Sequence, residues 1–530
     1  MIINSRQFPR LIFSSLIIIL VASFVIITLT PYGAATSPDS ISYLDVAKNI
    51  HTGNGLVLTD YHINSKNHYT PLTTWPPLYP LLLSTFTAPD KNEAFAASQM
   101  AILTLSISGL LMFLLLRPSI GNKFATVAAL IFLTASPILT VFIYAWSESL
   151  FIPLLLFSSL CCLKTIKAIS GNSVAQYRIY LLLMTVSLTM LVYCRYIGIF
   201  FAILWIPPAW KLFKKRKSWF LSYIIMILCY TALVSTLFIR NYYLTGHLSG
   251  TARVGSTKGL VENLADLIHT VFAFLPNTPV LLWISVLSAL GITFYRWHRR
   301  QLPDNSNNYP ATSYTSYLFL ISIVSCTGYL CFLLLLRTIT QFDAIDIRLI
   351  SLIFPFLLII LFLTASRSWQ THNWRKLPLL TGSGMLIIMI AVQGISTYKG
   401  TLTSWQQHGS PNLPMNIKYS YNNFTKPPDK NLLQYIIQKL NNGKIETAVT
   451  ERPKIFSFTA RIKAKKFPSS TITPETIATI NSIKNGVLIL TSKHSLDNLI
   501  AYYGNKEKLP ILTQYLKYNL LVITLPLPAN

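Results

Sequence analysis

Long apolar runs separated by short polar loops dominate the chain up to about residue 396. Runs of about 18 or more apolar residues are long enough to cross the hydrocarbon core of a bilayer as a helix. The pattern predicts an α-helical polytopic membrane protein with about 11 transmembrane helices. The predicted spans are 11–30, 95–116, 123–143, 148–166, 177–194, 196–210, 219–239, 279–297, 314–336, 347–365 and 377–396.

Two of these spans are short and adjoin each other. Spans 177–194 and 196–210 are separated only by Arg195, so they are predicted to form a hairpin that does not cross fully. The first run, 11–30, has the position of a signal peptide, but it is long for one and is followed by a weak cleavage site. We therefore expect it to be a retained helix.

Composition agrees with this class. Of 530 residues, 52% are apolar and only 12% are charged, and the mean hydropathy is +0.49. A soluble domain carries roughly twice that share of charged residues. The net charge of +27 is attributed to cationic loops rather than to nucleic-acid binding, because no compact basic and aromatic platform for stacking bases is visible.

The basic residues gather in alternate loops, which predicts the orientation. With the N-terminus in the cytoplasm, the inner loops include the run 211–217 and hold most of the Lys and Arg residues that precede residue 397. Three long segments, 31–76, 240–278 and the tail, then lie outside the plasma or inner membrane. Long loops on one face of a scaffold are where function usually sits, so the chemistry is expected there.

Two domains are predicted. Residues 1–396 form the transmembrane catalytic domain, with 31–94 as its first extracytoplasmic loop, and 397–530 form a small extracytoplasmic α/β domain. Within that domain the alternation predicts helices near 432–440, 475–483 and 496–503, and strands near 447–449, 486–490 and 520–525.

Metal and disulfide sites receive no support from spacing. The six cysteines lie in or beside apolar runs and form no CxxC pair. His51, His62, His68 and Asp60 share the first outer loop, but their spacing matches no zinc motif. No cofactor is expected, and a divalent metal is not supported.

The first outer loop opens with Ser37-Pro38-Asp39-Ser40, followed by Tyr43. Asp39 or Ser40 can cap a helix that runs to about residue 50, and residues 39 and 43 share a face of that helix. Two readings of Asp39 stay open: a structural N-cap carboxylate, or a carboxylate that performs chemistry.

Two further residues near the ends of spans are secondary candidates. Glu148 is the only carboxylate between residues 95 and 239 and sits at the edge of a span, where an ionisable group is costly. A surface carboxylate at a helix N-terminus is the alternative. Trp75 precedes Pro76-Pro77, where an aromatic-belt role explains it as well.

Several arginines at the outer ends of spans oppose the inside-positive rule: Arg195, Arg240, Arg253, Arg337 and Arg348. Asp346 precedes the last of them. Arginine forks at headgroup level suit a bound phosphate, through charge-assisted bidentate bonds. The alternative is snorkelling to the headgroups of membrane lipids.

Together, these residues resemble a known family. A first helix followed by Pro38-Asp39-Ser40, then Trp75-Pro76-Pro77, Ser147-Glu148 and Arg195-Tyr196 is similar to the GT-C glycosyltransferases. Within them the chain resembles the dolichyl-phosphate-mannose protein mannosyltransferases and their lipid A aminoarabinose transferase relatives. The resemblance covers residues 1–396.

The resemblance implies a polyprenyl-phosphate sugar donor, and transfer with inversion to an extracytoplasmic hydroxyl of a lipid, glycan or protein. It implies that Asp39 deprotonates the acceptor, while Tyr43, Arg195, Arg240, Arg253 and Arg348 surround the donor. Many members have a second acid after the aspartate, where this chain has Ser40. Lipid A transferases have a lysine before Pro-Pro, whereas this chain has Trp75, which argues against a close lipid A aminoarabinose transferase.

The main alternative is a multi-pass transporter or flippase of lipid-linked glycans. Transporters tend to show repeat symmetry and polar residues in mid-membrane. Here no repeat is seen and the polar groups gather on one face.

Overall fold

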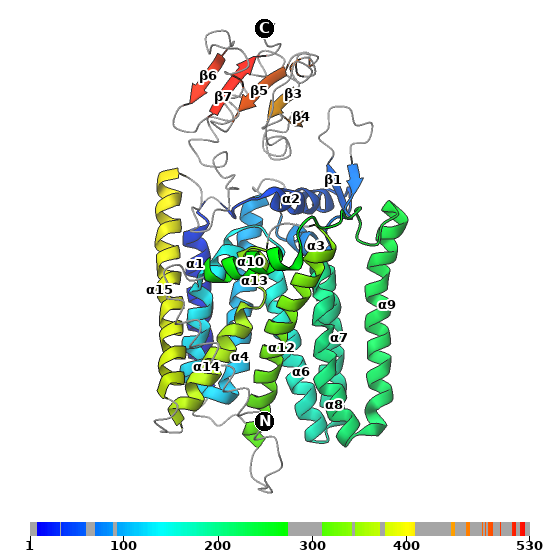
Figure 1. Ribbon diagram of the computed structural model, residues 1–530, viewed down its shortest axis with the longest axis vertical. Helices are drawn as coiled ribbons and strands as arrows, with labels where there is room; N and C mark the ends of the chain where they lie inside the picture. The colour runs from blue at the N-terminus through cyan, green and yellow to red at the C-terminus, as the bar shows by residue number, and fades with distance from the viewer. Residues whose placement is uncertain are drawn as a thin grey trace.

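A computed structural model of the protein shows a helical bundle with a small sheet beyond one end (Figure 1). The structure describes residues 8–31, 33–59, 69–87, 93–273, 310–341, 345–370 and 377–408. In the tail it describes five strands and residues 477, 480, 483 and 499.

Seven of the described helical segments are long and apolar enough to cross a membrane. They comprise α1 (Phe8–Leu29), α4 (Glu93–Thr134), α6 (Glu148–Ser170), α7 (Val174–Cys194), η1 (Tyr196–Trp205) with α8 (Ile206–Lys215), η2 (Lys217–Trp219) with α9 (Phe220–Thr245), and α12 (Pro310–Ile339). Two further helices, α14 (Phe354–Gln370) and α15 (Leu377–His408), complete the bundle. The prediction of a membrane-spanning helical protein is confirmed, whereas the count of about 11 is not, and span 279–297 lies outside the described residues.

A kink separates the predicted spans 95–116 and 123–143. Gly121 has φ of 78° inside α4, a backbone conformation that glycine adopts without steric cost. The predicted span 123–143 corresponds to the last part of α4, which ends at Thr134, and to α5 (Ser136–Ile143), which has a proline in its first turn. The predicted boundary between the spans 95–116 and 123–143 therefore lies where Gly121 interrupts the helical backbone of α4.

The predicted break at Arg195 is present, but the expectation that the two segments do not cross fully is wrong, because Val174–Cys194 and Tyr196–Lys215 are each long and apolar enough to span a membrane. α7 ends at Cys194, Arg195 is extended, and the chain continues as a 3-10 helix rather than an α-helix. A Cβ on Gly198 would lie 2.5 Å from the carbonyl carbon and oxygen of Leu191, so only glycine allows this close return of η1 against α7.

The predicted span 347–365 is divided. α13 (Ile347–Ile350) is a separate turn, and α14 begins at Phe354, with Pro355 as its second residue. Proline has a fixed φ and no N–H, so it suits the first turn of a new helix and not the interior of a continuing one. As a result, Arg348 lies on a short turn before the span.

The short elements between the long helices gather at one end of the bundle, which is the upper end in Figure 1. They are α2 (Pro38–His51), the hairpin of β1 (Val57–Thr59) and β2 (Tyr69–Pro71), α3 (Leu78–Ser84), α10 (Leu260–Ala273) and α13. This end carries the polar residues that the sequence analysis selected.

The tail contains a five-stranded sheet with strand order β4-β3-β5-β7-β6. β3 (Thr447–Thr450) is parallel to β4 (Lys463–Lys466) and β5 (Gly486–Leu490), whereas β7 (Leu520–Thr524) is antiparallel to β5 and β6 (Ile511–Tyr515). The three predicted strands are confirmed, and β4 and β6 were not predicted. The predicted helices lie wholly or mostly outside the described residues, and α15 continues past the predicted domain boundary at 396 to His408.

Candidate functional site

Ser37 is the N-cap of α2, and neither Asp39 nor Ser40 caps it. The Ser37 side chain accepts a hydrogen bond from the backbone N–H of Ser40 at 3.3 Å, and Pro38 fills the first helical position. The prediction of the cap was wrong, because the serine before the proline already satisfies the free N–H. Asp39 therefore stands in the first turn with its side chain available for other contacts.

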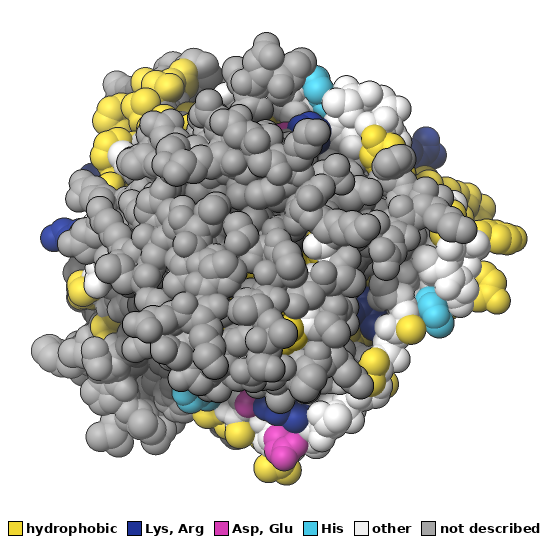
Figure 2. All heavy atoms as spheres, turned by 90° about the horizontal axis from the view of Figure 1, so that it is seen from above, with side chains coloured by type: hydrophobic (Ala, Val, Ile, Leu, Met, Phe, Trp, Pro, Cys, Tyr) yellow, Lys and Arg dark blue, Asp and Glu magenta, His cyan; other side chains and the backbone are white. Residues whose placement is uncertain are grey.

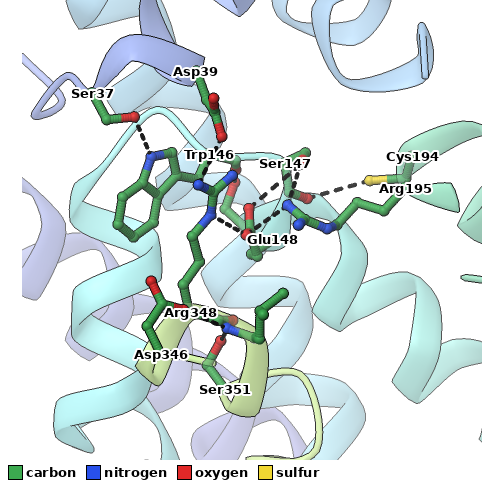
Figure 3. Close-up of polar contacts among 12 residues, drawn as sticks. Ser37, Asp39, Trp146, Ser147, Glu148, Cys194, Arg195, Asp346, Arg348 and Ser351 are labelled. Carbon is green, nitrogen blue, oxygen red and sulfur yellow. Dashed lines mark hydrogen bonds and ion pairs between the residues drawn. The ribbon is translucent and has the colours of Figure 1, made fainter. Parts of the chain in front are cut away.

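Asp39 is paired with an arginine that lies far away in the sequence. Arg348 Nη1 lies 2.7 Å from Asp39 Oδ2. The Asp39 side chain keeps 26% of its surface exposed, against 13% for Arg348, so the carboxylate is the more accessible partner of the pair drawn in Figure 3. The reading of Asp39 as only a capping carboxylate is overturned.

Glu148 joins the two arginines of the site. Its Oε1 lies 2.6 Å from Arg195 Nη1 and also accepts a hydrogen bond from Arg348 Nε (Figure 3). The Glu148 side chain is fully buried, so the alternative of a surface carboxylate is wrong. A buried carboxylate persists only where opposite charges and hydrogen bonds compensate its lost hydration, and the two guanidinium groups do this.

Arg348 contacts Trp146 as well as the two carboxylates, and further residues fix the position of Trp146 and of the turn that carries Arg348. Its guanidinium carbon lies 4.7 Å from the centre of the Trp146 ring, a cation–π geometry. Trp146 Nε1 donates to Ser37 Oγ at 2.7 Å, which ties this ring to the cap of α2. Asp346 is the N-cap of α13, accepting from the N–H of Leu349 at 3.2 Å, and thereby fixes the turn that carries Arg348.

The charge state of Arg348 follows from these contacts. Burial acts to lower the pKa of the guanidinium, but the carboxylates of Glu148 and Asp39 outweigh it, so the pKa of Arg348 is raised. The described core of the site then holds two carboxylates and two guanidinium groups, which balance formally.

Tyr43 is buried and reaches the site through Ser147. Its Oη is 3.2 Å from Ser147 Oγ, which also accepts from Arg195 Nη1 at 3.0 Å. Trp75 meets the Tyr43 ring edge-on at 5.9 Å, so Trp75 packs beside the site without a polar contact to the charged residues. Burial raises the pKa of Tyr43, which keeps the phenol neutral.

Arg240 and Arg253 do not join this cluster. Arg240 Nη1 donates to the backbone carbonyl of Leu72 at 2.9 Å, and its neighbour Asn241 donates to Tyr196 Oη at 2.7 Å. Tyr196 in turn donates to the carbonyl of Thr73 at 2.8 Å. The network holds the end of the first loop against α9, while Arg253 is exposed in the loop that follows α9.

Arg337, another arginine that opposed the inside-positive rule, is buried beside α10. Its Nη2 lies 3.4 Å from Asp266 Oδ2, which also pairs with Lys258 at 2.8 Å. Of the described Lys and Arg side chains, those visible from above lie apart from one another (Figure 2). The two arginines paired with Glu148 have only 17% and 13% of their side chains exposed, so they are largely buried components of the site.

Metal ligands do not assemble in the described residues. Across those parts of the chain, no group of three or more His, Cys, Asp or Glu is placed to hold an ion. His51 is exposed at the end of α2, and Asp60, His62, His68 and Asp343 lie outside the described residues.

Three contacts were not anticipated from the sequence: Ser37 as cap, Trp146 beneath Arg348, and Ser147 between Tyr43 and Arg195. Trp146 and Ser147 immediately precede Glu148, so their adjacency to the only acid in a long stretch was the available signal. Nothing in the local pattern indicated that their partners come from α2, η1 and α13.

No known protein-family profile and no curated protein matches the sequence. Among solved structures, the chain is similar to ArnT from Cupriavidus metallidurans bound to undecaprenyl phosphate, with a TM-score of 0.55 and 11% identity, covering 97% of this chain and 99% of that one. The apo state of ArnT from the same organism gives a TM-score of 0.54 at 12% identity, covering 96% and 97%. At such identity the likeness establishes the fold, and this multi-pass membrane protein has the fold of the GT-C glycosyltransferases.

Proposed function

We propose that the protein is a membrane glycosyltransferase. It moves a sugar from a polyprenyl-phosphate donor to an extracytoplasmic acceptor hydroxyl, with inversion. The observation that carries the proposal is the arrangement of Asp39, Arg348, Glu148 and Arg195 at one end of a GT-C bundle. The similar ArnT structure contains undecaprenyl phosphate, which supports a lipid-linked donor.

Asp39 is the proposed general base. Its carboxylate is the more exposed partner of its ion pair, which leaves part of it accessible to an acceptor hydroxyl. Removal of the hydroxyl proton as attack on the anomeric carbon begins is worth about 10²–10⁴-fold in rate. The bond from the anomeric carbon to the donor phosphate oxygen breaks, and the bond to the acceptor oxygen forms on the opposite face.

Arg348 and Arg195 are the proposed phosphate ligands. Arg348 uses Nε and Nη1, and Arg195 uses Nη1, for their carboxylate contacts. Each guanidinium has five N–H donors, so both retain donors for a phosphate oxygen. Positive groups fixed where charge develops on the leaving phosphate would lower the barrier. Glu148 would hold both guanidinium groups in place as a positioning residue.

Tyr43, Trp75, Arg240, Arg253 and Asp346 take supporting positions in this proposal. Tyr43 and Trp75 line the floor beside the ion pairs, and Asp346 fixes the turn of Arg348. Arg240 secures the loop that carries Trp75, and the exposed Arg253 remains the candidate for outer contact with donor or acceptor.

The test uses full-length protein reconstituted in lipid, radiolabelled polyprenyl-phosphate sugars and a membrane extract as acceptor. Wild type should transfer label, and Asp39→Asn should lose about 10²–10⁴-fold of that rate. Glu93→Gln is the matched control. Glu93, the first residue of α4, pairs at 3.3 Å with Lys48, which is on α2 like Asp39 but nine residues further along, and the variant should keep near wild-type transfer.

Equal transfer by wild type and a folded Asp39→Asn variant would show that Asp39 is not the general base. Movement of intact lipid-linked sugar across the bilayer, without cleavage of the sugar–phosphate bond, would replace the transferase by the transporter reading.

A further inference from the structure

A dense cluster of positive charge lies at the end of the bundle opposite Asp39. It occupies the end of α8 and the start of η2, which Figure 1 shows at the lower end of the bundle, away from α2. No acidic residue occurs between residues 149 and 239 of the sequence. We call these residues the basic cluster: Lys211, Lys214, Lys215, Arg216 and Lys217.

Within the part of the chain that the structure describes, the basic cluster has no carboxylate partner. Among the described residues, none of its five side chains forms an ion pair with a carboxylate, whereas Lys48, Lys258, Arg195, Arg337 and Arg348 all do. Five like charges within seven residues repel one another. The described carboxylates therefore do not balance the charge of the cluster.

Aromatic rings hold the cations in fixed positions. Lys214 Nζ lies 4.4 Å from the centre of the Trp210 ring, and Lys217 Nζ lies 5.2 Å from that of Phe213. Arg216 and Lys211 lie 5.8 Å and 5.6 Å from the rings of Trp219 and Tyr317. Ring faces attract cations but carry no net charge, so they orient the cluster without neutralising it.

Helix α8, which carries Lys211, Lys214 and Lys215, is packed against the rest of the bundle. Pro208 and Leu212 form its buried side. The ring of Trp219, at the far end, lies 5.0 Å from that of Tyr177, whose hydroxyl donates to the Trp219 carbonyl at 3.2 Å. The cations are thus presented on a packed scaffold rather than on a free loop.

The same helix exposes apolar side chains. Ile206, Trp210 and Phe213 are 62%, 58% and 61% exposed, and their spacing puts them on one side of α8. Leu221 and Ile225 at the start of α9 are likewise exposed. An apolar surface next to a group of lysines is the pattern of an element that meets both acyl chains and headgroups.

We propose that the basic cluster binds the phosphate headgroup of an anionic glycerophospholipid in the leaflet on the side of α8. Lys214, Lys215 and Lys217 contact the phosphate, and Trp210 and Phe213 lie against the acyl chains. Charge complementarity calls for an anion, and the adjoining exposed apolar surface selects a lipid over a soluble one. This site is independent of the glycosyltransferase proposal, since it lies at the other end of the bundle.

The test measures binding of phosphatidylglycerol and phosphatidylcholine to the full-length protein in detergent by native mass spectrometry. Wild type should prefer phosphatidylglycerol, and the K214Q/K215Q/K217Q variant should bind it about tenfold or more weakly. The matched control is K123Q/K167Q/R178Q. This control also removes three positive charges, from the exposed residues Lys123, Lys167 and Arg178. Its affinity for phosphatidylglycerol should stay within about twofold of wild type.

Three results would overturn the proposal: equal losses in both triple variants, equal binding of phosphatidylcholine, or full displacement of phosphatidylglycerol by inorganic tripolyphosphate. If the triple variant does not fold, the single variants Lys214→Gln and Lys217→Gln serve instead. Each should weaken phosphatidylglycerol binding about threefold, and unchanged binding in both would refute the site.

Discussion

Arg348 Nη1 lies 2.7 Å from Asp39 Oδ2, while Nε of the same guanidinium bonds the buried Glu148. One side chain on a short turn thus holds carboxylates from two other elements, the first turn of α2 and the start of α6. Such sharing depends on the planar fork of arginine, because an ammonium group is a compact point charge. The geometry at Asp39 therefore depends on a residue that is distant from it in the sequence.

Arg348→Lys should uncouple the two carboxylates. A lysine at this position can approach one carboxylate but cannot reproduce the two bonds of the fork, so transfer activity should fall about 10²-fold or more. The label-transfer assay measures this, with Arg178→Lys, an exposed arginine at the start of α7, as control. Wild-type rates in Arg348→Lys would show that the bridge does not matter for transfer.

Glu148→Gln should destabilise the protein strongly. The substitution leaves the Arg195 guanidinium without its carboxylate partner and removes one of the two carboxylate partners of Arg348. Breaking a buried ion pair in this way costs about 3–5 kcal/mol. Thermal unfolding in detergent, followed by tryptophan fluorescence, measures the change. Glu93→Gln, at a more exposed ion pair, should cost about 0–1 kcal/mol, and similar costs for both variants would contradict the assigned role of Glu148.

Gly250→Ala should disturb the loop that carries Trp75. Gly250 has φ of 76°, and a Cβ there would lie 2.0 Å from the carbonyl oxygen of Thr73. Backbone must move to relieve this overlap, at a cost of about 1–3 kcal/mol. Gly259→Ala is the control, since nothing lies within 4 Å of its added Cβ. Equal unfolding temperatures for both variants would show that the close approach is not needed.

Tyr43 and Arg348 should not contribute to pH dependence in the neutral range. Burial raises the pKa of Tyr43, and the two carboxylates raise that of Arg348. For a group whose folded-state pKa is raised, stability is fully present below the unfolded-state pKa and is lost only above it. For tyrosine, that loss begins above about pH 10.

The measurement is unfolding temperature against pH from about 7 to 11 for wild type and Tyr43→Phe. Wild type should decline above about pH 10, and Tyr43→Phe should decline less steeply there. A Tyr43-dependent transition near neutral pH would contradict the buried, neutral phenol.

Much of the architecture was determined by local sequence. The apolar runs predicted membrane-spanning helices, the predicted breaks between residues 116 and 123 and at Arg195 are real, and three of the tail strands followed from their apolar residues. These features are set by hydrophobicity and backbone conformation, which act over a few residues. The same is true of the position of Asp39 in the first turn of a helix after Pro38.

Only the tertiary structure decided which charges meet. Five arginines opposed the inside-positive rule and were equivalent in sequence, yet Arg195 and Arg348 meet Glu148, Arg240 binds a backbone carbonyl, Arg337 pairs with Asp266, and Arg253 is exposed. Glu148 changed from a residue at the edge of a span to the buried centre of the site. An ion pair depends on distance in space, which is set by helix packing between segments far apart in the chain, and no local pattern encodes that distance.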